Sequence, residues 1–154
     1  MVIKGSKSLF ILAIILPFFI SSCGSFPGSS VVLIDARGKR YKLVMSEIEM
    51  LEGEDRVNVL KANTLKIRNK PIKIIIRESS QNENYFVARV NPEDLGEVVE
   101  LLKTYNKITV DTAGRVRGFE VVLGHLSWQP GYYALIQQAK RGETPQVWHF
   151  EFEE

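Results

Sequence analysis

The sequence predicts an α+β fold in a single domain, with a largely antiparallel sheet and one or two packed helices. Short segments with the two-residue alternation of strands outnumber segments with helical spacing, and they come mostly in runs. Such runs favour antiparallel pairing, whereas a parallel sheet needs strands that alternate with helices. The expected globular part, residues 31–154, is long enough for one core and too short for two comfortable domains.

Nine segments have strand patterns. One of the clearest covers residues 72–77, because Ile72, Ile74 and Ile76 alternate with Lys73 and Arg77. The last segment has large aromatic residues on one face and polar residues on the other. The predicted strands cover residues 31–36, 40–45, 56–60, 64–68, 72–77, 85–90, 107–111, 116–123 and 147–152.

The clearest helix prediction covers residues 92–105. Asn91 is a favourable N-cap, Pro92 suits the first helical position, and Glu93 and Asp94 favour the positive end of the helix dipole. Apolar residues then follow at helical spacing. The apolar stripe consists of Leu95, Val98, Val99, Leu102 and Tyr105.

Two shorter segments also have helical patterns. Residues 132–139 carry apolar side chains at helical spacing, and Gly142 follows as a stop signal. Residues 46–51 predict a short helical turn, with Ser46 as its cap and Gly53 as its end.

The first 22 residues have the order of a secretory signal. Lys4 and Lys7 precede an unbroken apolar run over residues 9–20, and small residues follow. A membrane-spanning helix needs roughly 20 apolar residues. This run is shorter and contains Pro17, which disfavours a helix. We therefore expect a cleaved signal over residues 1–22 rather than a permanent membrane span.

The end of the signal, Ile20-Ser21-Ser22-Cys23, resembles the lipobox of bacterial lipoproteins. The resemblance implies cleavage before Cys23 and acylation of its thiol and new amino terminus, which would anchor the protein in a membrane. Residues 24–30 are rich in Gly and Ser and predict a flexible tether. The implied location is extracytoplasmic, on the cell membrane, or on the outer membrane if the organism has one. The alternative is an ordinary secreted protein with one leftover thiol.

The charge balance gives no support to nucleic acid as a partner. The chain has 20 Lys and Arg residues and 18 Asp and Glu residues, and cleavage of the signal would remove Lys4 and Lys7. The mature side chains would then carry no net charge, whereas nucleic-acid-binding domains are typically basic. Cys23 is the only cysteine. We therefore expect no disulfide, and stability must come from packing.

A basic stretch without acidic residues runs from Lys61 to Arg77. The alternation predicts that Lys66, Arg68, Lys73 and Arg77 share the solvent face of two neighbouring strands. In a tethered domain, such a face could contact the anionic headgroups of the membrane. The alternative is an ordinary solvated face, or an edge strand that lysines protect from aggregation.

The C-terminal third, residues 118–154, resembles the end of the D-alanyl-D-alanine dipeptidase and carboxypeptidase family of zinc peptidases. The resemblance rests mainly on Gln146-Val147-Trp148-His149. In that family this strand reads Glu-x-x-His, with the glutamate as general base and the histidine on zinc. The resemblance implies that His149 is a zinc ligand, but the amide of Gln146 cannot take a proton as a base does.

The same resemblance places the family's acidic zinc ligand at Glu120 and its upstream histidine at Ala113. A catalytic zinc needs three protein ligands and an open position for water. The set would therefore be His149, Glu120 and His125, which is the only other histidine. The alternative is that the aromatic residues of the last strand belong to the core, while His149 faces water or a polar neighbour.

A further candidate is the aromatic segment that contains Trp128, Tyr132 and Tyr133. Aromatic residues dominate many recognition surfaces, so this segment could bind a protein or a sugar-peptide polymer. The alternative is that the same side chains cover or enter the core. The sequence pattern does not separate the two interpretations.

Two functional hypotheses follow. The first is a lipid-anchored, non-enzymatic envelope protein without a cofactor, whose domain binds another envelope protein or peptidoglycan or has a structural role. The second is a zinc-dependent peptidase acting on D-alanyl peptides of the cell wall. The first is preferred because the catalytic inventory of the second is incomplete.

Overall fold

The computed structural model describes residues 30–51, 57–77, 84–138 and 144–154, and these residues form strands and turns without a helix. The predicted α+β class, with one or two packed helices, is therefore wrong, and the fold is all-β. No helix in the described ranges is long and apolar enough to cross a membrane. Parts of the predictions lie outside the described residues. These are the signal, Cys23, tether residues 24–29, Gly53, Arg56 at the start of one predicted strand, Ala139 and Gly142.

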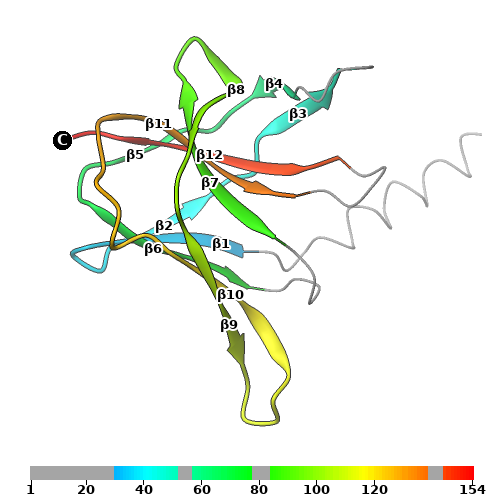
Figure 1. Cartoon of the computed structure of the whole chain (residues 1–154), viewed down its shortest axis with the longest axis vertical. Helices are drawn as coiled ribbons and strands as arrows, with labels where there is room; N and C mark the ends of the chain where they lie inside the picture. Colours follow the sequence, from blue (N-terminus) through cyan, green and yellow to red (C-terminus); the bar gives the residue numbers. More distant parts are fainter. Residues whose placement is uncertain (1–29, 52–56, 78–83, 139–143) are drawn as a thin grey trace, which may run out of the picture.

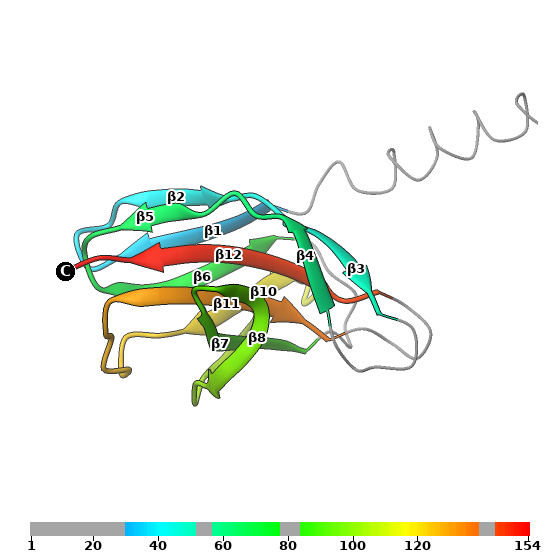
Figure 2. The same ribbon diagram turned by 90° about the horizontal axis from the view of Figure 1, so that it is seen from above.

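Two five-stranded sheets lie face to face in the order β2-β1-β6-β10-β9 (sheet A) and β5-β12-β11-β7-β8 (sheet B), as Figures 1 and 2 show. Sheet A consists of β2 (Arg40–Leu43), β1 (Ser30–Asp35), β6 (Pro71–Arg77), β10 (Val116–Val122) and β9 (Tyr105–Val110). Sheet B consists of β5 (Leu65–Ile67), β12 (Gln146–Phe152), β11 (Gly131–Gln137), β7 (Tyr85–Asn91) and β8 (Asp94–Leu101). Neighbouring strands are antiparallel except β5 and β12, which are parallel.

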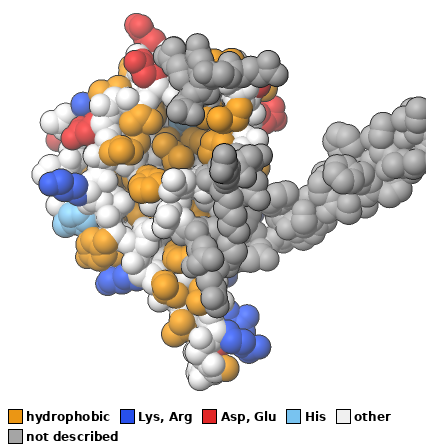
Figure 3. All heavy atoms as spheres, turned by 45° about the vertical axis from the view of Figure 1, so that its right-hand side comes forward, with side chains coloured by type: hydrophobic (Ala, Val, Ile, Leu, Met, Phe, Trp, Pro, Cys, Tyr) orange, Lys and Arg blue, Asp and Glu red, His pale blue; other side chains and the backbone are white. Residues whose placement is uncertain are grey.

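A third, two-stranded sheet consists of β3 (Glu47–Met50) and β4 (Val57–Lys61). It lies on the outer side of sheet B, at the upper right of Figure 1. Ile48 packs there against a small apolar cluster of sheet B. The β9–β10 hairpin projects from the opposite end of the sandwich (Figure 1), and apolar and basic side chains are exposed along it (Figure 3).

The main core fills the space between sheets A and B. Its members alternate along the strands, so that one face of every central strand is buried. Trp148, Phe150 and Phe152 all belong to this core, as one interpretation of the last strand expected. Trp128 packs against it, with its ring centroid 4.7 Å from that of Tyr133. The aromatic segment therefore covers the core at this point.

The predicted helix over residues 92–105 is instead a turn followed by the edge strand β8. The side chain of Asn91 accepts a hydrogen bond from the Glu93 amide (3.0 Å), and Asp94 accepts one from the Gly96 amide (3.1 Å). These local bonds close a turn between β7 and β8, because Asn and Asp cap turns as well as helices. The signals for a helix start therefore mark a hairpin.

The predicted helix over residues 132–139 is wrong, because residues 131–137 form the strand β11. This strand is buried on both faces. Tyr133 and Leu135 point into the main core, while Ala134 lies in a second cluster on the outer face of sheet B. Burial on both faces removes the alternation of apolar and polar residues, so a short apolar run can imitate a helix. The predicted turn at residues 46–51 is likewise a strand, β3.

Asp35 holds the turn between β1 and β2. Its buried carboxylate accepts hydrogen bonds from the backbone amides of Arg37 and Lys39, the hydroxyl of Tyr41 and the amide of Asn69. Burial alone would raise the pKa of this carboxyl. The bonds from Lys39, Tyr41, Arg37 and Asn69 outweigh it and lower the pKa. The turn is therefore built around a buried carboxylate that stays ionised.

Candidate functional site

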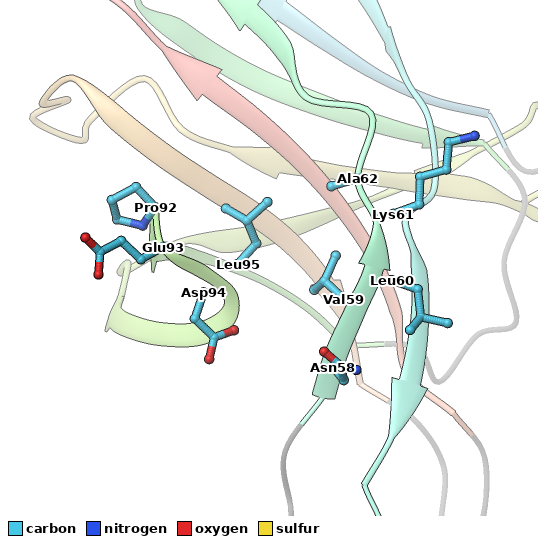
Figure 4. A pocket seen from close by; sticks show the side chains of 9 residues that line it. All are labelled: Asn58, Val59, Leu60, Lys61, Ala62, Pro92, Glu93, Asp94 and Leu95. Carbon is cyan, nitrogen blue, oxygen red and sulfur yellow. The ribbon is translucent and has the colours of Figure 1, made fainter.

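A groove runs across the outer side of sheet B, between β4 and the turn that joins β7 to β8 (Figure 4). Its volume is about 600 Å³. One wall is the strand β4 and the residue after it, and the other is the β7–β8 turn. The groove is lined by Asn58, Val59, Leu60, Lys61, Ala62, Pro92, Glu93, Asp94 and Leu95.

An apolar pocket of about 200 Å³ adjoins this groove and shares Val59 and Leu95 with it. Its floor is the second apolar cluster, formed by Val90, Ala134 and Val147 on the outer face of sheet B. In the space-filling view, apolar side chains gather in the upper part of the molecule (Figure 3). The pocket is lined by Val57, Val59, Val90, Leu95, Gly96, Val98, Ala134, Ile136, Pro145 and Val147.

The position of β4 depends on a glycine in β8. A side chain at Gly96 would collide with the carbonyl of Val57, so only glycine lets the two strands approach this closely. The strands touch but are not hydrogen-bonded as neighbours in a sheet. In the described part of the chain, β3 is the only hydrogen-bonded neighbour of β4. The second edge of β4 therefore faces the groove.

Charged residues of both signs flank the groove. Lys61 lies at the end of β4, and Glu93 and Asp94 lie on the facing turn; the ammonium group of Lys61 and the carboxylate of Glu93 point away from the gap between the two walls (Figure 4). A further hydrogen bond stabilises the turn: the side chain of Asn91 donates to the carboxylate of Glu97 (2.8 Å). The site thus combines charged flanking residues, a strand edge without a hydrogen-bonded neighbour among the described residues, and an apolar floor.

His149 fixes the elements around this site to sheet B. Its Nδ1 lies 2.6 Å from the hydroxyl of Ser46, just before β3, and its Nε2 lies 2.9 Å from the carbonyl of Leu95 in β8. A carbonyl only accepts, so Nε2 carries the proton and Nδ1 accepts the Ser46 hydroxyl. Burial lowers the pKa of His149, and the bond to Leu95 opposes this in part. The imidazole is therefore held neutral.

The three residues of the predicted zinc set are not brought together. His149 lies on the outer face of sheet B, buried between Ser46 and Leu95. Glu120 lies on the outer face of sheet A, where its carboxylate is 4.0 Å from Lys73. His125 follows β10, bonds the carbonyl of Lys103 and stacks on Tyr105. No cluster of three or more potential metal ligands occurs within the described ranges.

The four predicted basic residues do not share one pair of neighbouring strands. Lys66 and Arg68 lie in and just after β5 of sheet B, where both approach Glu153 at 3.1 and 3.9 Å. Lys73 and Arg77 lie on β6 in the middle of sheet A. The turn between these segments therefore takes the chain from one sheet to the other.

Sequence reasoning missed the groove for a clear reason. The residues that line the groove and its apolar pocket come from β4, from β8 and from three other strands of sheet B, which are far apart in the chain. Gly96 was a usable signal, because a glycine inside a predicted helix is unfavourable and indicates a close approach of backbones. Val57 and Val59 alternate with Asn58 and show only that one face of β4 is apolar.

Comparison with known proteins gives this chain no family to which it can be assigned. Both the motif of the zinc peptidases and the lipobox consequently remain predictions from the sequence. Neither protein-family models, nor curated proteins, nor solved structures yield a match to the chain.

Proposed function

We propose that this protein is a lipid-anchored, non-catalytic binding protein of the cell envelope. Its anchor is the acylated Cys23 that the lipobox predicts. Its binding site is the groove between β4 and β8, and its ligand is an extended peptide segment of another envelope protein. The groove carries this proposal, because it offers a strand edge and an apolar pocket side by side.

An extended peptide suits the geometry of the groove. The second edge of β4 has backbone groups that no neighbouring strand uses within the described part of the chain. A peptide can pair with such an edge through its main chain, and alternate side chains then enter pockets beside the strand. The apolar pocket next to Val59 and Leu95 is placed to receive one such side chain.

The mouth of the groove adds a preference for polar or charged flanking residues. Lys61 and Glu93 flank the groove with side chains that point away from it, so they can pair only with charges on parts of the peptide that extend beyond the groove, while Asp94 lies closer to the gap. We therefore expect a ligand with an apolar side chain at its centre and charged residues beside it. The geometry favours binding over the zinc alternative, since Glu120 and His149 lie on the outer faces of different sheets.

The decisive experiment selects peptides from a random display library and then locates the best binder on the protein. Calorimetry gives its affinity, and hydrogen exchange shows which backbone amides it protects. We expect slower exchange at the β4 amides that point away from β3, such as that of Val59, which lies two residues after Val57 and shares the orientation of the Val57 carbonyl towards β8. Peptides that protect other strands only, or binding to isolated peptidoglycan without any selected peptide, would contradict the proposed ligand.

A matched pair of variants sharpens this test. Val59→Trp fills the apolar pocket and should weaken peptide binding by about tenfold or more, because the central side chain loses its place. Ile108→Trp adds the same bulk at an exposed position of β9 and should leave binding unchanged. Equal affinities for the two variants would place the peptide elsewhere.

The anchor is tested separately. Mass spectrometry of the protein from a bacterial host that processes lipoproteins should show the chain beginning at Cys23, with acyl chains attached. Cys23→Ser should abolish the acylation and move the protein from the detergent phase to the aqueous phase. An unmodified thiol at Cys23 in the wild-type protein would disprove the anchoring.

A further inference from the structure

The outer face of sheet A is basic and open. Strand pairing places Lys42, Val32, Ile75, Glu120 and Lys107 in one row across all five strands. These positions alternate with core residues, so their side chains point away from sheet B. The neighbouring row contains Arg40, Ile34, Lys73, Val122 and Tyr105, and Arg77 lies beyond the first row.

The strand positions of this face carry five cations and one acid. Arg40, Lys42, Arg77 and Lys107 are exposed and have no ion pair within the described residues. Lys73 is half-buried and lies 4.0 Å from Glu120, the one acidic residue among these strand positions. Apolar residues lie between the charges. Such a face is complementary to a surface that is negatively charged and apolar just beneath.

The chain enters the fold in this same sheet. Ser30 begins β1 and lies opposite Arg77. Ser30 lies only seven positions after Cys23 in the chain. A chain of this length spans at most about 25 Å when fully extended. An acyl anchor at Cys23 therefore keeps the end of sheet A within reach of the headgroups.

We propose that the outer face of sheet A lies on the anionic headgroups of the membrane in which Cys23 is anchored. This inference rests on the proposed anchoring. It has a consequence for the binding site, because the outer faces of the two sheets point in opposite directions. The groove of sheet B then faces away from the membrane and stays open to its ligand.

Energy transfer from the protein to the membrane tests the orientation. The anchored protein, with Cys23 acylated, is reconstituted into vesicles that contain an acceptor-labelled lipid. A donor is attached either at Thr109→Cys, on the exposed face of sheet A, or at Leu60→Cys, on β4. With phosphatidylglycerol in the vesicles, we expect higher transfer from position 109 than from position 60. Equal transfer, or higher transfer from position 60, would overturn the proposed orientation.

Charge reversal provides the matched control. Lys42→Glu together with Lys107→Glu places two acids at opposite ends of the basic row and should remove the difference in transfer between the two positions. Lys66→Glu together with Arg68→Glu changes the charge equally, but on sheet B, and should preserve the difference. Identical behaviour of the two double variants would show that net charge alone, and not this face, is responsible.

The same preparation separates the failure of this inference from the failure of the anchor. If mass spectrometry finds no acyl chain on Cys23, the proposed function fails, and sedimentation of that protein with phosphatidylglycerol vesicles still tests the basic face. Binding should then fall by about tenfold or more in the Lys42→Glu, Lys107→Glu variant. An anchored protein without a preferred orientation would refute the inference and leave the anchor intact.

Discussion

The two sheets of the sandwich share one core but have opposite outer faces. The outer face of sheet B is apolar around Val90, Ala134 and Val147, and Val147 is almost fully buried there. The outer face of sheet A is more exposed and carries basic residues on three of its five strands, β2, β6 and β9. The two-stranded sheet β3–β4 accounts for this difference between the outer faces, because it packs on sheet B, where Ile48 contacts the apolar cluster.

This difference assigns separate roles to the two faces. A face that is covered can be apolar without promoting aggregation, and its cover creates the groove. A face that stays open carries charged side chains beside its apolar ones, as the outer face of sheet A does. The following predictions test this division, beginning with the largest expected effect.

The same substitution on the two outer faces should have very different effects. Val147→Lys buries an ammonium group under β3–β4 and should cost about 4 kcal/mol or more in the free energy of unfolding. Ile75→Lys places the same group on the open face of sheet A, beside Glu120, and should cost about 1 kcal/mol or less. Urea unfolding followed by the fluorescence of Trp128 and Trp148 measures both. Similar costs would mean that the outer face of sheet B is accessible to water.

The next largest effect on stability should come from the turn between β1 and β2 in sheet A. Asp35→Ala leaves the amide of Lys39 and the hydroxyl of Tyr41 without their acceptor, which should cost about 2–3 kcal/mol. Asp111 makes a similar set of bonds in the β9–β10 hairpin, but its side chain is only partly buried and its partners Ala113 and Arg115 are exposed. Asp111→Ala should therefore lower the melting temperature less than Asp35→Ala. The reverse order would contradict the importance of burial at Asp35.

The pH dependence gives Asp35 an independent test. Its native pKa is lowered from 3.8, so the unfolded chain binds a proton at a higher pH than the folded protein does. The stabilisation is complete above about pH 4 and is lost as the pH falls through the native pKa. Asp35→Asn should flatten this acid limb of the curve of stability against pH. An unchanged limb would assign the acid sensitivity to other carboxyl groups.

Most strands of the sandwich could be predicted from the sequence, whereas the segments predicted as helices form strands and turns. The reasons are physical. Ile74 and Ile76 alternate with Lys73 and Arg77 because sheet A is buried on one face only, so its strands keep the two-residue period. Leu135 has apolar neighbours on both sides because sheet B is covered on both faces near the groove. The period disappears there, and the sequence is equally compatible with a helix.

The candidate site was less predictable than the fold. Its lining residues come together only through the packing of β3–β4 on sheet B, a long-range event that leaves no local pattern. The sequence did identify His149 as unusual and allowed for a polar neighbour. It could not show that the neighbours are Ser46 and Leu95, which lie 103 and 54 residues away.

His149 should make the cover of sheet B sensitive to acid. Burial lowers its pKa from 6.5, so below this pH the unfolded chain takes up a proton that the folded protein does not. Stability is therefore complete above about pH 6.5 and falls on acidification until the native pKa is reached, with a slope of at most about 1.4 kcal/mol per pH unit. Urea unfolding between pH 5 and 8 measures this slope.

Two histidine variants assign the effect. His149→Gln should remove the slope between pH 5 and 6.5, because glutamine does not titrate. His125→Gln should keep it, since His125 is exposed and lies near Tyr105, away from the cover. A slope that survives in His149→Gln would mean that protonation of His149 does not destabilise the contact of β3 and β8 with sheet B.

The smallest effect on stability should come from Glu120→Gln on the open face. The ion pair with Lys73 is long and partly exposed, so its loss should change the free energy of unfolding by about 0.5 kcal/mol or less. The same substitution removes the one acid from the strand positions of the basic face. Binding to phosphatidylglycerol vesicles should then strengthen several-fold, while binding to neutral vesicles stays the same. A fall in stability without any gain in vesicle binding would mean that Glu120 stabilises sheet A and that the charges of this face do not bind the membrane.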